Sequence, residues 1–148
     1  MKKEKIKIRK ANKEDERGII NIFKKRENLN QKDKENKKLK KYIKEKKKKK
    51  TFLVLVAEID KKIVGVVICN ISRISKTNAD LVDIYVLNEY RNKGIGSELM
   101  YSLYMELKNR GIENLGLYSE NNPKTLNFYK NQGFEIGRLI RRCDKKIK

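Results

Sequence analysis

A chain of 148 residues is long enough for one compact domain with a single core, and we expect one domain over residues 1–148. Hydrophobic residues make up 38% and gather in runs at residues 52–57 and 63–68, which argues against general disorder; the absence of histidine leaves no zinc set and no Cys-His nucleophile. The formal net charge of +20 permits binding to an anionic partner but does not establish it, because a lysine-rich solvated surface carries the same charge.

The N-terminal residues 1–9 alternate lysine with isoleucine and lack the continuous apolar stretch of a signal peptide. No membrane-spanning stretch is evident, so we expect a cytoplasmic protein in which Cys69 and Cys143 are reduced, buried thiols. Ile6 and Ile8 alternate with charged residues, which predicts a first short strand with one buried face.

Two helices are predicted next. Asn12 stands ahead of acids that favour a helix start, and apolar residues at helical spacing then predict a helix over residues 13–26. Within residues 31–50 lysine dominates, and Leu39, Tyr42 and Ile43 form one narrow apolar stripe. We expect residues 46–50 to fray into a mobile basic end, because like charges repel along a helix.

Three strands should follow as an antiparallel meander. Residues 51–59 and 63–71 are rich in strand-forming side chains and are joined by a short polar connection, which is typical of a hairpin. Residues 79–87 form the third strand of this group.

Helices and strands then alternate. We predict a helix over residues 96–110, a strand over 115–119, a helix over 123–131 and a strand from Phe134. The order predicts an α/β fold with a mixed, mostly antiparallel central sheet flanked by helices on both sides.

The segment between Val86 and Ser97 leaves a strand and enters a helix through Gly94 and Gly96. A helix N-terminus offers unpaired N–H groups and a positive dipole end, so this turn could hold a pyrophosphate. A Walker loop is absent, and Leu99 stands where the dinucleotide fingerprint requires a third glycine. Two glycines alone are equally typical of a tight turn between a strand and a helix.

Two motifs resemble the GCN5-related N-acetyltransferase (GNAT) superfamily. Residues 91–96 match its pattern [QR]-x-x-G-x-[GA] after the fourth strand, and residues 129–134 match its Y-x-x-x-G-F. Asn122 precedes Tyr129 by seven positions, as in that family. The order of elements agrees over nearly the whole chain, and the resemblance implies a sheet whose fourth and fifth strands splay at the cofactor site.

The resemblance implies acetyl-coenzyme A (acetyl-CoA) as cosubstrate and transfer of its acetyl group to a primary amine. Backbone groups of Ile84, Tyr85 and Val86 would pair with the pantetheine arm, and Asn122 would contact this arm or shape a helix start. The pyrophosphate would be held by the turn and first helical residues: Arg91, Asn92, Lys93, Gly94, Ile95, Gly96 and Ser97.

The chemistry requires a neutral amine, stabilisation of an oxyanion and a proton for the leaving thiolate. Tyr129 would lie near the thioester sulfur and suits the proton donor, since a phenol at pKa ~10 is close to a thiol at ~8.5. The Val86 N–H could stabilise the oxyanion. Asp83 and Glu120 are candidate bases, and each could equally be an ordinary surface carboxylate.

The acceptor stays open. Residues 83–100 locally resemble the diamine acetyltransferase branch, but Val82 replaces the glutamate that this branch has before its aspartate, and the net charge of +20 disfavours a polycationic acceptor. An alternative function is a basic module that binds nucleic acid or an acidic partner through residues 31–50. A last strand with an exposed edge would permit a homodimer.

Overall fold

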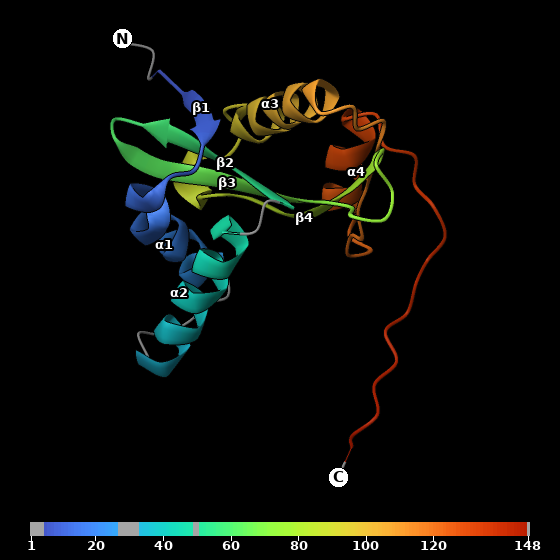
Figure 1. Cartoon of the computed structure of the whole chain (residues 1–148). Coiled ribbons are helices and arrows are strands. Elements are labelled where there is room, and N and C mark those ends of the chain that lie inside the picture. The colour runs from blue at the N-terminus through green and yellow to red at the C-terminus, as the bar shows by residue number, and fades with distance from the viewer. Residues whose placement is uncertain (1–4, 27–32, 49–50, 148) are drawn as a thin grey trace. The chain divides into compact units, whose positions relative to one another are not determined.

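The computed structural model describes residues 5–26, 33–48 and 51–147 (Figure 1). The chain forms two compact units, Met1–Leu117 and Tyr118–Lys148, each of which is described by itself.

The first unit is built on one sheet of five strands in the order β1-β2-β3-β4-β5. The first four strands are antiparallel to their neighbours, and β5 is parallel to β4. The α/β fold with a mixed, mostly antiparallel sheet is therefore confirmed. The strands are β1 (Lys7–Lys10), β2 (Phe52–Ile59), β3 (Lys62–Ile71), β4 (Asn78–Val86) and β5 (Asn114–Gly116).

The β2–β3 connection is a two-residue turn. Asp60 and Lys61 have φ angles of 47° and 64°, and Ile59 pairs directly with Lys62. Two successive positive φ angles match the twist of antiparallel strands, as in type I′ hairpins. The hairpin was predicted, but Lys62 belongs to β3 rather than to the connection.

The helical region before β2 starts at a capping box. The Asn12 side chain accepts a hydrogen bond from the Glu14 N–H at 2.9 Å, and the Asp15 carboxylate accepts one from the Asn12 N–H at 2.7 Å. This box satisfies N–H groups that a helix start leaves without partners. The helix predicted for residues 13–26 is present as the 3₁₀ turn η1 (Lys13–Asp15) and α1 (Glu16–Arg26).

The second helix, α2 (Asp33–Lys48), extends further than predicted. Residues 46–48 are helical, so the expected fraying is wrong there, and residues 49–50 lie outside the described residues. Each like-charge pair costs only about 0.2–0.5 kcal/mol, and lysines near a helix C-terminus interact favourably with its dipole. Ile43 is buried, Tyr42 is 39% exposed, and the Leu39 side chain lies outside the described residues.

Helices cover both faces of the sheet, with α1 and α2 on one face and α3 (Ile95–Asn109) on the other (Figure 1). On the α3 face, a Cβ added at Gly65 would lie 3.1 Å from a Leu99 methyl, so α3 packs tightly on β3 there. On the other face the core consists of Ile19, Ile20, Ile22, Phe23, Ile43, Val54, Val56, Ile63, Val66, Ile68 and Leu87.

The second unit contains α4 (Pro123–Asn131), with the bounds that the sequence predicts. The strand predicted from Phe134 is wrong, since residues 134–147 form no helix or strand. A strand requires a neighbour for its backbone groups, and this segment pairs with none in the described chain. The edge expected to support a homodimer is therefore missing. Cys143 lies in the same segment and is exposed, contrary to expectation, whereas Cys69 on β3 is buried.

No helix in the described part of the chain is long and apolar enough to cross a membrane.

Candidate active site

The two last strands of the sheet separate where the resemblance predicts a gap. β5 pairs with β4 over Asn78–Asp80 and ends at Gly116, short of the predicted residue 119. Over residues 81–86 of β4, the described chain therefore supplies no strand partner on that side. Backbone groups at such an edge can bond to an extended ligand.

Strand geometry decides which backbone groups of β4 face the gap. The Leu87 N–H donates to the Val64 carbonyl at 2.9 Å, and neighbouring residues of a strand send their groups to opposite sides. The backbone groups of Ile84 and Val86 are therefore directed to the gap, and those of Tyr85 are directed to β3. The Tyr85 backbone groups thus point away from the gap, which does not fit their predicted pairing with the pantetheine arm.

Arg91 is tied back to the end of β4. Its Nε donates to the Val86 carbonyl at 3.0 Å, and its guanidinium lies 4.9 Å from the centre of the Tyr85 ring. The carbonyl of Val86 is thus already engaged, which leaves its N–H as the group at this position for a ligand. These contacts hold the Arg91 side chain at the start of the turn, so the positive charge of Arg91 stays beside the turn.

The turn ends in a helix start shaped by glycine. Asn92 and Gly94 have φ angles of 60° and 79°, and Gly94 is the N-cap of α3, where no side-chain hydrogen bond caps the helix. A Cβ built at Gly94 meets nothing within 4 Å, so the space over the helix end is open. The first N–H groups of a 15-residue helix and its dipole fit a pyrophosphate.

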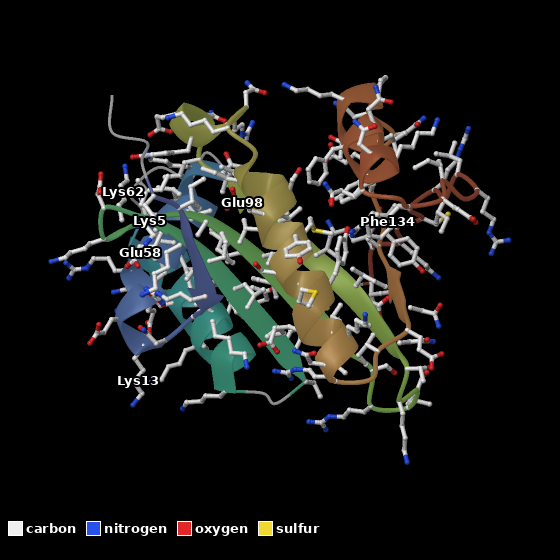
Figure 2. All side chains as sticks on the ribbon, turned by 90° about the horizontal axis from the view of Figure 1, so that it is seen from above. Lys5, Lys13, Glu58, Lys62, Glu98 and Phe134 are labelled. Atoms are coloured by element: carbon white, nitrogen blue, oxygen red, sulfur yellow. The ribbon has the colours of Figure 1, made fainter. Side chains whose placement is uncertain are left out.

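Charged side chains surround this helix start. Lys93 is exposed, and its Nζ lies 5.5 Å from the Tyr90 ring; the Lys62 Nζ lies 5.3 Å from the same ring. Glu98 on the first turn of α3 is exposed and contributes an opposing negative charge (Figure 2). Lys62 and Tyr90 were not predicted, because only the fold brings the β2–β3 turn beside the loop after β4.

Asp83, a candidate base, is paired with Arg26 at the end of α1. The Asp83 side chain is 13% exposed and that of Arg26 is 40% exposed. Burial and, next, the charge of Asp83 raise the pKa of the Tyr42 phenol, whereas the charge of Arg26 lowers it. Tyr42 therefore lies close enough to both residues to sense their charges. No local sequence pattern joins Arg26 or Tyr42 to Asp83, so neither residue was predicted beside it.

The other predicted residues lie in the second unit. Glu120 is exposed, and its carbonyl accepts hydrogen bonds from the Asn122 N–H at 2.8 Å and the Ser119 hydroxyl at 3.1 Å. The Asn122 side chain accepts from the N–H groups of Lys124 and Thr125 at 2.9 and 3.5 Å. Asn122 is thus the N-cap of α4, which is one of its two predicted roles.

Tyr129 lies in the last turn of α4. Gly133, just after the helix, has a φ of 89°. Its N–H donates to the Lys130 carbonyl at 2.9 Å, and the Phe134 N–H donates to the Tyr129 carbonyl at 3.0 Å. These two bonds form a Schellman motif, which satisfies carbonyls at the helix end. The half-buried Tyr129 ring contacts the ring edges of Phe128 and Phe134, with centroids 5.3 and 5.6 Å apart.

Comparison with known proteins assigns the family. Residues 17–134 match the model of the acetyltransferase (GNAT) family. The chain belongs to this family of acetyltransferases. The match covers the core of the first unit and extends through α4 to Phe134.

Individual relatives agree in fold. The chain is 32% identical over 65 residues to an uncharacterized ycf52-like N-acetyltransferase of Prochlorococcus marinus, a match that spans 44% of this chain and 35% of the relative. A transcriptional regulator from Bacillus halodurans superposes with a TM-score of 0.81 at 21% identity, covering 95% of this chain and 100% of that one. Aminoglycoside N-acetyltransferase AAC(6')-Iy in complex with CoA gives 0.83 at 15% identity, covering 99% and 98%.

Proposed function

We propose that this chain is an acetyl-CoA-dependent N-acetyltransferase that moves an acetyl group to a primary amine. The observation that carries the proposal is the open side of β4 over residues 81–86, followed through the 3₁₀ turn η2 (Asn88–Tyr90) by the glycine-capped start of α3. Acetyl-CoA carries an extended pantetheine arm followed by a pyrophosphate, and the open strand edge and the helix start would bind these two parts in this order. Family membership supports the same activity.

The open edge and the helix start divide the binding of acetyl-CoA between them. The Ile84 and Val86 backbone groups would bond to the pantetheine arm, and the N–H groups at residues 92–97 would bond to the pyrophosphate. Lys93 and Arg91 add positive charge, while Glu98 opposes it. Acetyl-CoA supplies the acetyl group as a reactive thioester. The Asn122 amide would reach the arm while its oxygen caps α4.

Proton transfer is assigned to three side chains. The Tyr129 hydroxyl would donate its proton to the leaving thiolate, a transfer for which a phenol and a thiol are well matched in acidity. Asp83 or Glu120 would accept the proton of the amine, directly or through water. Asp83 is held in an ion pair with Arg26, so a base role for Asp83 would require an acceptor that reaches this pair.

Release of free thiol from acetyl-CoA tests the activity across a panel of amines: polyamines, amino acids, aminoglycosides and peptide N-termini. Aminoglycosides belong in the panel because the neighbour AAC(6')-Iy acts on this class. We expect thiol release above the amine-free rate with at least one amine, together with a mass gain of the product that matches one acetyl group. Release at the amine-free rate with every amine would contradict the proposal.

A second candidate function is a basic binding module. A surface hollow of about 1150 Å³ in the first unit includes none of the predicted site residues in its lining. Basic side chains outnumber acidic ones in this lining; the acidic ones include Glu14 and Glu16. The basic residues are Arg9, Lys13, Arg17, Lys24, Lys40, Lys61 and Lys62. Clustered lysines bind phosphates without sequence preference.

Retention on heparin tests this second candidate. Replacing Lys13, Lys24 and Lys40 by glutamine should lower the salt concentration of elution if the hollow binds polyanions. The control replaces Arg73, Lys76 and Lys108, three exposed cations outside the hollow. Equal losses in both variants would show a general effect of net charge and would exclude the hollow as a site.

A further inference from the structure

The ion pair between Arg26 and Asp83 has an outer and an inner member. The Arg26 side chain is 40% exposed, and the Asp83 side chain is 13% exposed. A molecule that approaches this side of β4 therefore meets the guanidinium before it meets the carboxylate. The charge that it senses first is positive.

The neighbouring helix adds to this positive charge. Tyr42 on α2 lies near both members of the pair. Lys38, four residues earlier on the same helix face, is exposed, and Lys41 beside Tyr42 is exposed as well. Glu45, three residues after Tyr42, is the acidic neighbour on that face. Among the described residues of α2 next to Tyr42, Lys38 and Lys41 are thus two cations and Glu45 is one anion.

We propose that Arg26 is a specificity-determining residue that selects amine acceptors carrying a carboxylate close to the amine. The inference rests on the proposed function, in which the amine approaches the part of β4 that holds Asp83. A planar guanidinium binds a carboxylate through two parallel hydrogen bonds, a geometry that a polyamine cannot supply. A polyamine would also meet like charge there, and Val82 adds no second carboxylate to attract it.

A contact between Arg26 and the acceptor carboxylate would orient the acceptor for attack. The acceptor carboxylate anchors the molecule while its amine stays reactive. Two sources fit this chemistry, a free amino acid and the N-terminus of an acidic peptide.

Matched acceptors test the selection. We would compare kcat/KM for Asp-Ala amide with Asn-Ala amide, and for alanine with alanine amide, and include spermidine. In each pair, the wild type should have the higher kcat/KM for the acceptor with the extra carboxylate. The pair with the larger preference shows whether the acceptor is a peptide N-terminus or a free amino acid. Arg26→Gln should lower the ratio of kcat/KM for the carboxylate acceptor to kcat/KM for its amide partner by roughly 10- to 100-fold, the effect of losing a charged hydrogen-bond pair.

Two further variants separate the site from net charge. Lys25→Gln removes the same charge from the adjacent residue, which is paired with Glu89 at 3.4 Å rather than with Asp83, and should leave the preference unchanged. Arg26→Lys keeps the charge but loses the planar fork, so it should retain part of the preference. Equal effects of Lys25→Gln and Arg26→Gln would overturn the proposal.

Calorimetric binding of Asp-Ala amide to the protein without acetyl-CoA gives a readout independent of turnover. Binding that weakens in Arg26→Gln and persists in Lys25→Gln supports the selection. Equal binding of Asp-Ala and Asn-Ala amides contradicts it. Acetyl transfer to amines without preference for carboxylates would overturn this inference alone, whereas a protein that fails to bind acetyl-CoA would overturn the proposed function.

Discussion

The ring of Phe134 packs against the ring of Tyr129 with centroids 5.6 Å apart, and the same two residues share a backbone hydrogen bond of 3.0 Å. Gly133 makes this possible, because its φ of 89° turns the chain back over the end of α4. The spacing Y-x-x-x-G-F is therefore the spacing of a helix C-cap with its apolar contact. The capping role accounts for the rings and the glycine of this motif.

Tyr129→Phe removes the hydroxyl and keeps the ring, so it distinguishes the catalytic contribution of the hydroxyl from the packing of the ring. The phenylalanine keeps both edge contacts, so the packing of the ring at the end of α4 should be retained. Turnover should fall by roughly 10²–10⁴, the usual contribution of a general acid, with acetyl-CoA affinity retained. Tyr118→Phe, at a residue that is 87% exposed, is the matched control. Wild-type turnover in Tyr129→Phe would refute the acid role.

Gly133→Ala should destabilise the second unit. An alanine forced to a positive φ is less stable than glycine by about 1 kcal/mol, so the urea midpoint should decrease. Gly137→Ala provides the comparison, since an added Cβ there meets nothing within 4 Å and its φ lies outside the left-handed region. Equal midpoints for the two variants would show that the Schellman turn contributes no measurable stability.

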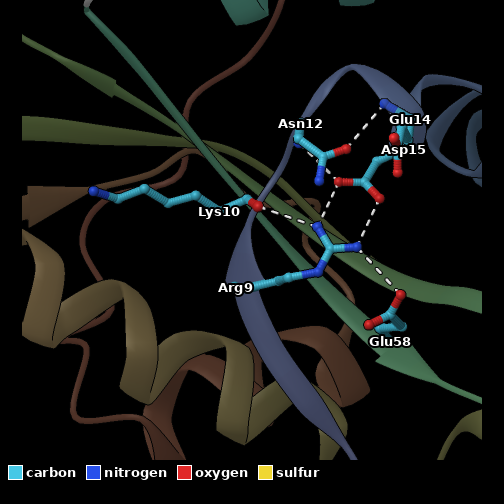
Figure 3. A network of polar contacts seen from close by, with 6 residues as sticks. All are labelled: Arg9, Lys10, Asn12, Glu14, Asp15 and Glu58. Carbon is cyan, nitrogen blue, oxygen red and sulfur yellow. Dashed lines mark hydrogen bonds and ion pairs between the residues drawn. The ribbon is translucent and has the colours of Figure 1, made fainter. Parts of the chain in front are cut away.

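Asp15→Ala should be the more damaging of two neighbouring acidic substitutions. The buried Asp15 carboxylate accepts hydrogen bonds from Arg9 at 2.6 and 2.8 Å and completes the capping box (Figure 3). The bond to Asp15 raises the pKa of the Arg9 guanidinium, and Glu58 adds to this effect at 3.2 Å. Loss of these charged hydrogen bonds and of the capping box should cost about 1–3 kcal/mol, with Glu58 remaining as a partner of Arg9.

Glu14→Ala is the control for that loss. Glu14 is exposed, and its backbone N–H, which the substitution keeps, makes the bond to Asn12. Its effect should stay within about 0.5 kcal/mol in urea unfolding. A similar loss in both variants would mean that local helix propensity, rather than the Arg9 pair, sets the stability of this region.

The two thiols should react at very different rates. Burial, and next the charge of Asp80, raise the pKa of the Cys69 thiol to about 12, whereas Cys143 is exposed. At pH 8 only about one Cys69 in 10,000 would be the reactive thiolate. A chromogenic disulfide should thus titrate one thiol quickly in the native protein and two after denaturation. In Cys143→Ser the fast thiol should vanish; two fast thiols in the native wild type would contradict the burial of Cys69.

The raised pKa of Cys69 also sets a pH dependence. The unfolded thiol ionises near pH 9 and the folded one near 12, so the unfolded state loses its proton first. This contribution to stability is present below pH 9 and is lost as the pH rises toward 12. Cys69→Ala should therefore show a smaller decrease in the free energy of unfolding between pH 8 and pH 10 than the wild type. Identical slopes would contradict the assignment.

Local patterns predicted most of the fold. Alternating or continuous apolar runs identified β2, β3 and β4, and Asn12 and Asn122 marked helix starts because capping acts within four residues of the chain. The glycines at the start of α3 were recognisable for the same reason. Short-range geometry depends on neighbours in sequence, so the sequence displays it.

The errors concern long-range contacts. Phe134 and Ile136 alternate with polar residues as a strand would, but a strand also needs a partner, and β5 ends at Gly116. Arg26 and Asp83 are separated by 57 positions, and no local pattern joins them. The direction of the Tyr85 backbone depends on its register with β3, which composition does not determine. Contacts between segments that are distant in sequence therefore determine the features that local patterns did not predict.

Binding of acetyl-CoA, measured by titration calorimetry, tests the central claim most directly. Gly96→Glu places a negative charge on the second residue of α3 and should weaken binding by roughly 100-fold or more, as expected for like charges in close contact. Gly137→Glu adds the same charge at an exposed glycine outside the predicted cofactor residues and should bind as the wild type does. Unchanged affinity in Gly96→Glu, or no binding by the wild type, would contradict the assignment of this turn as the acetyl-CoA site.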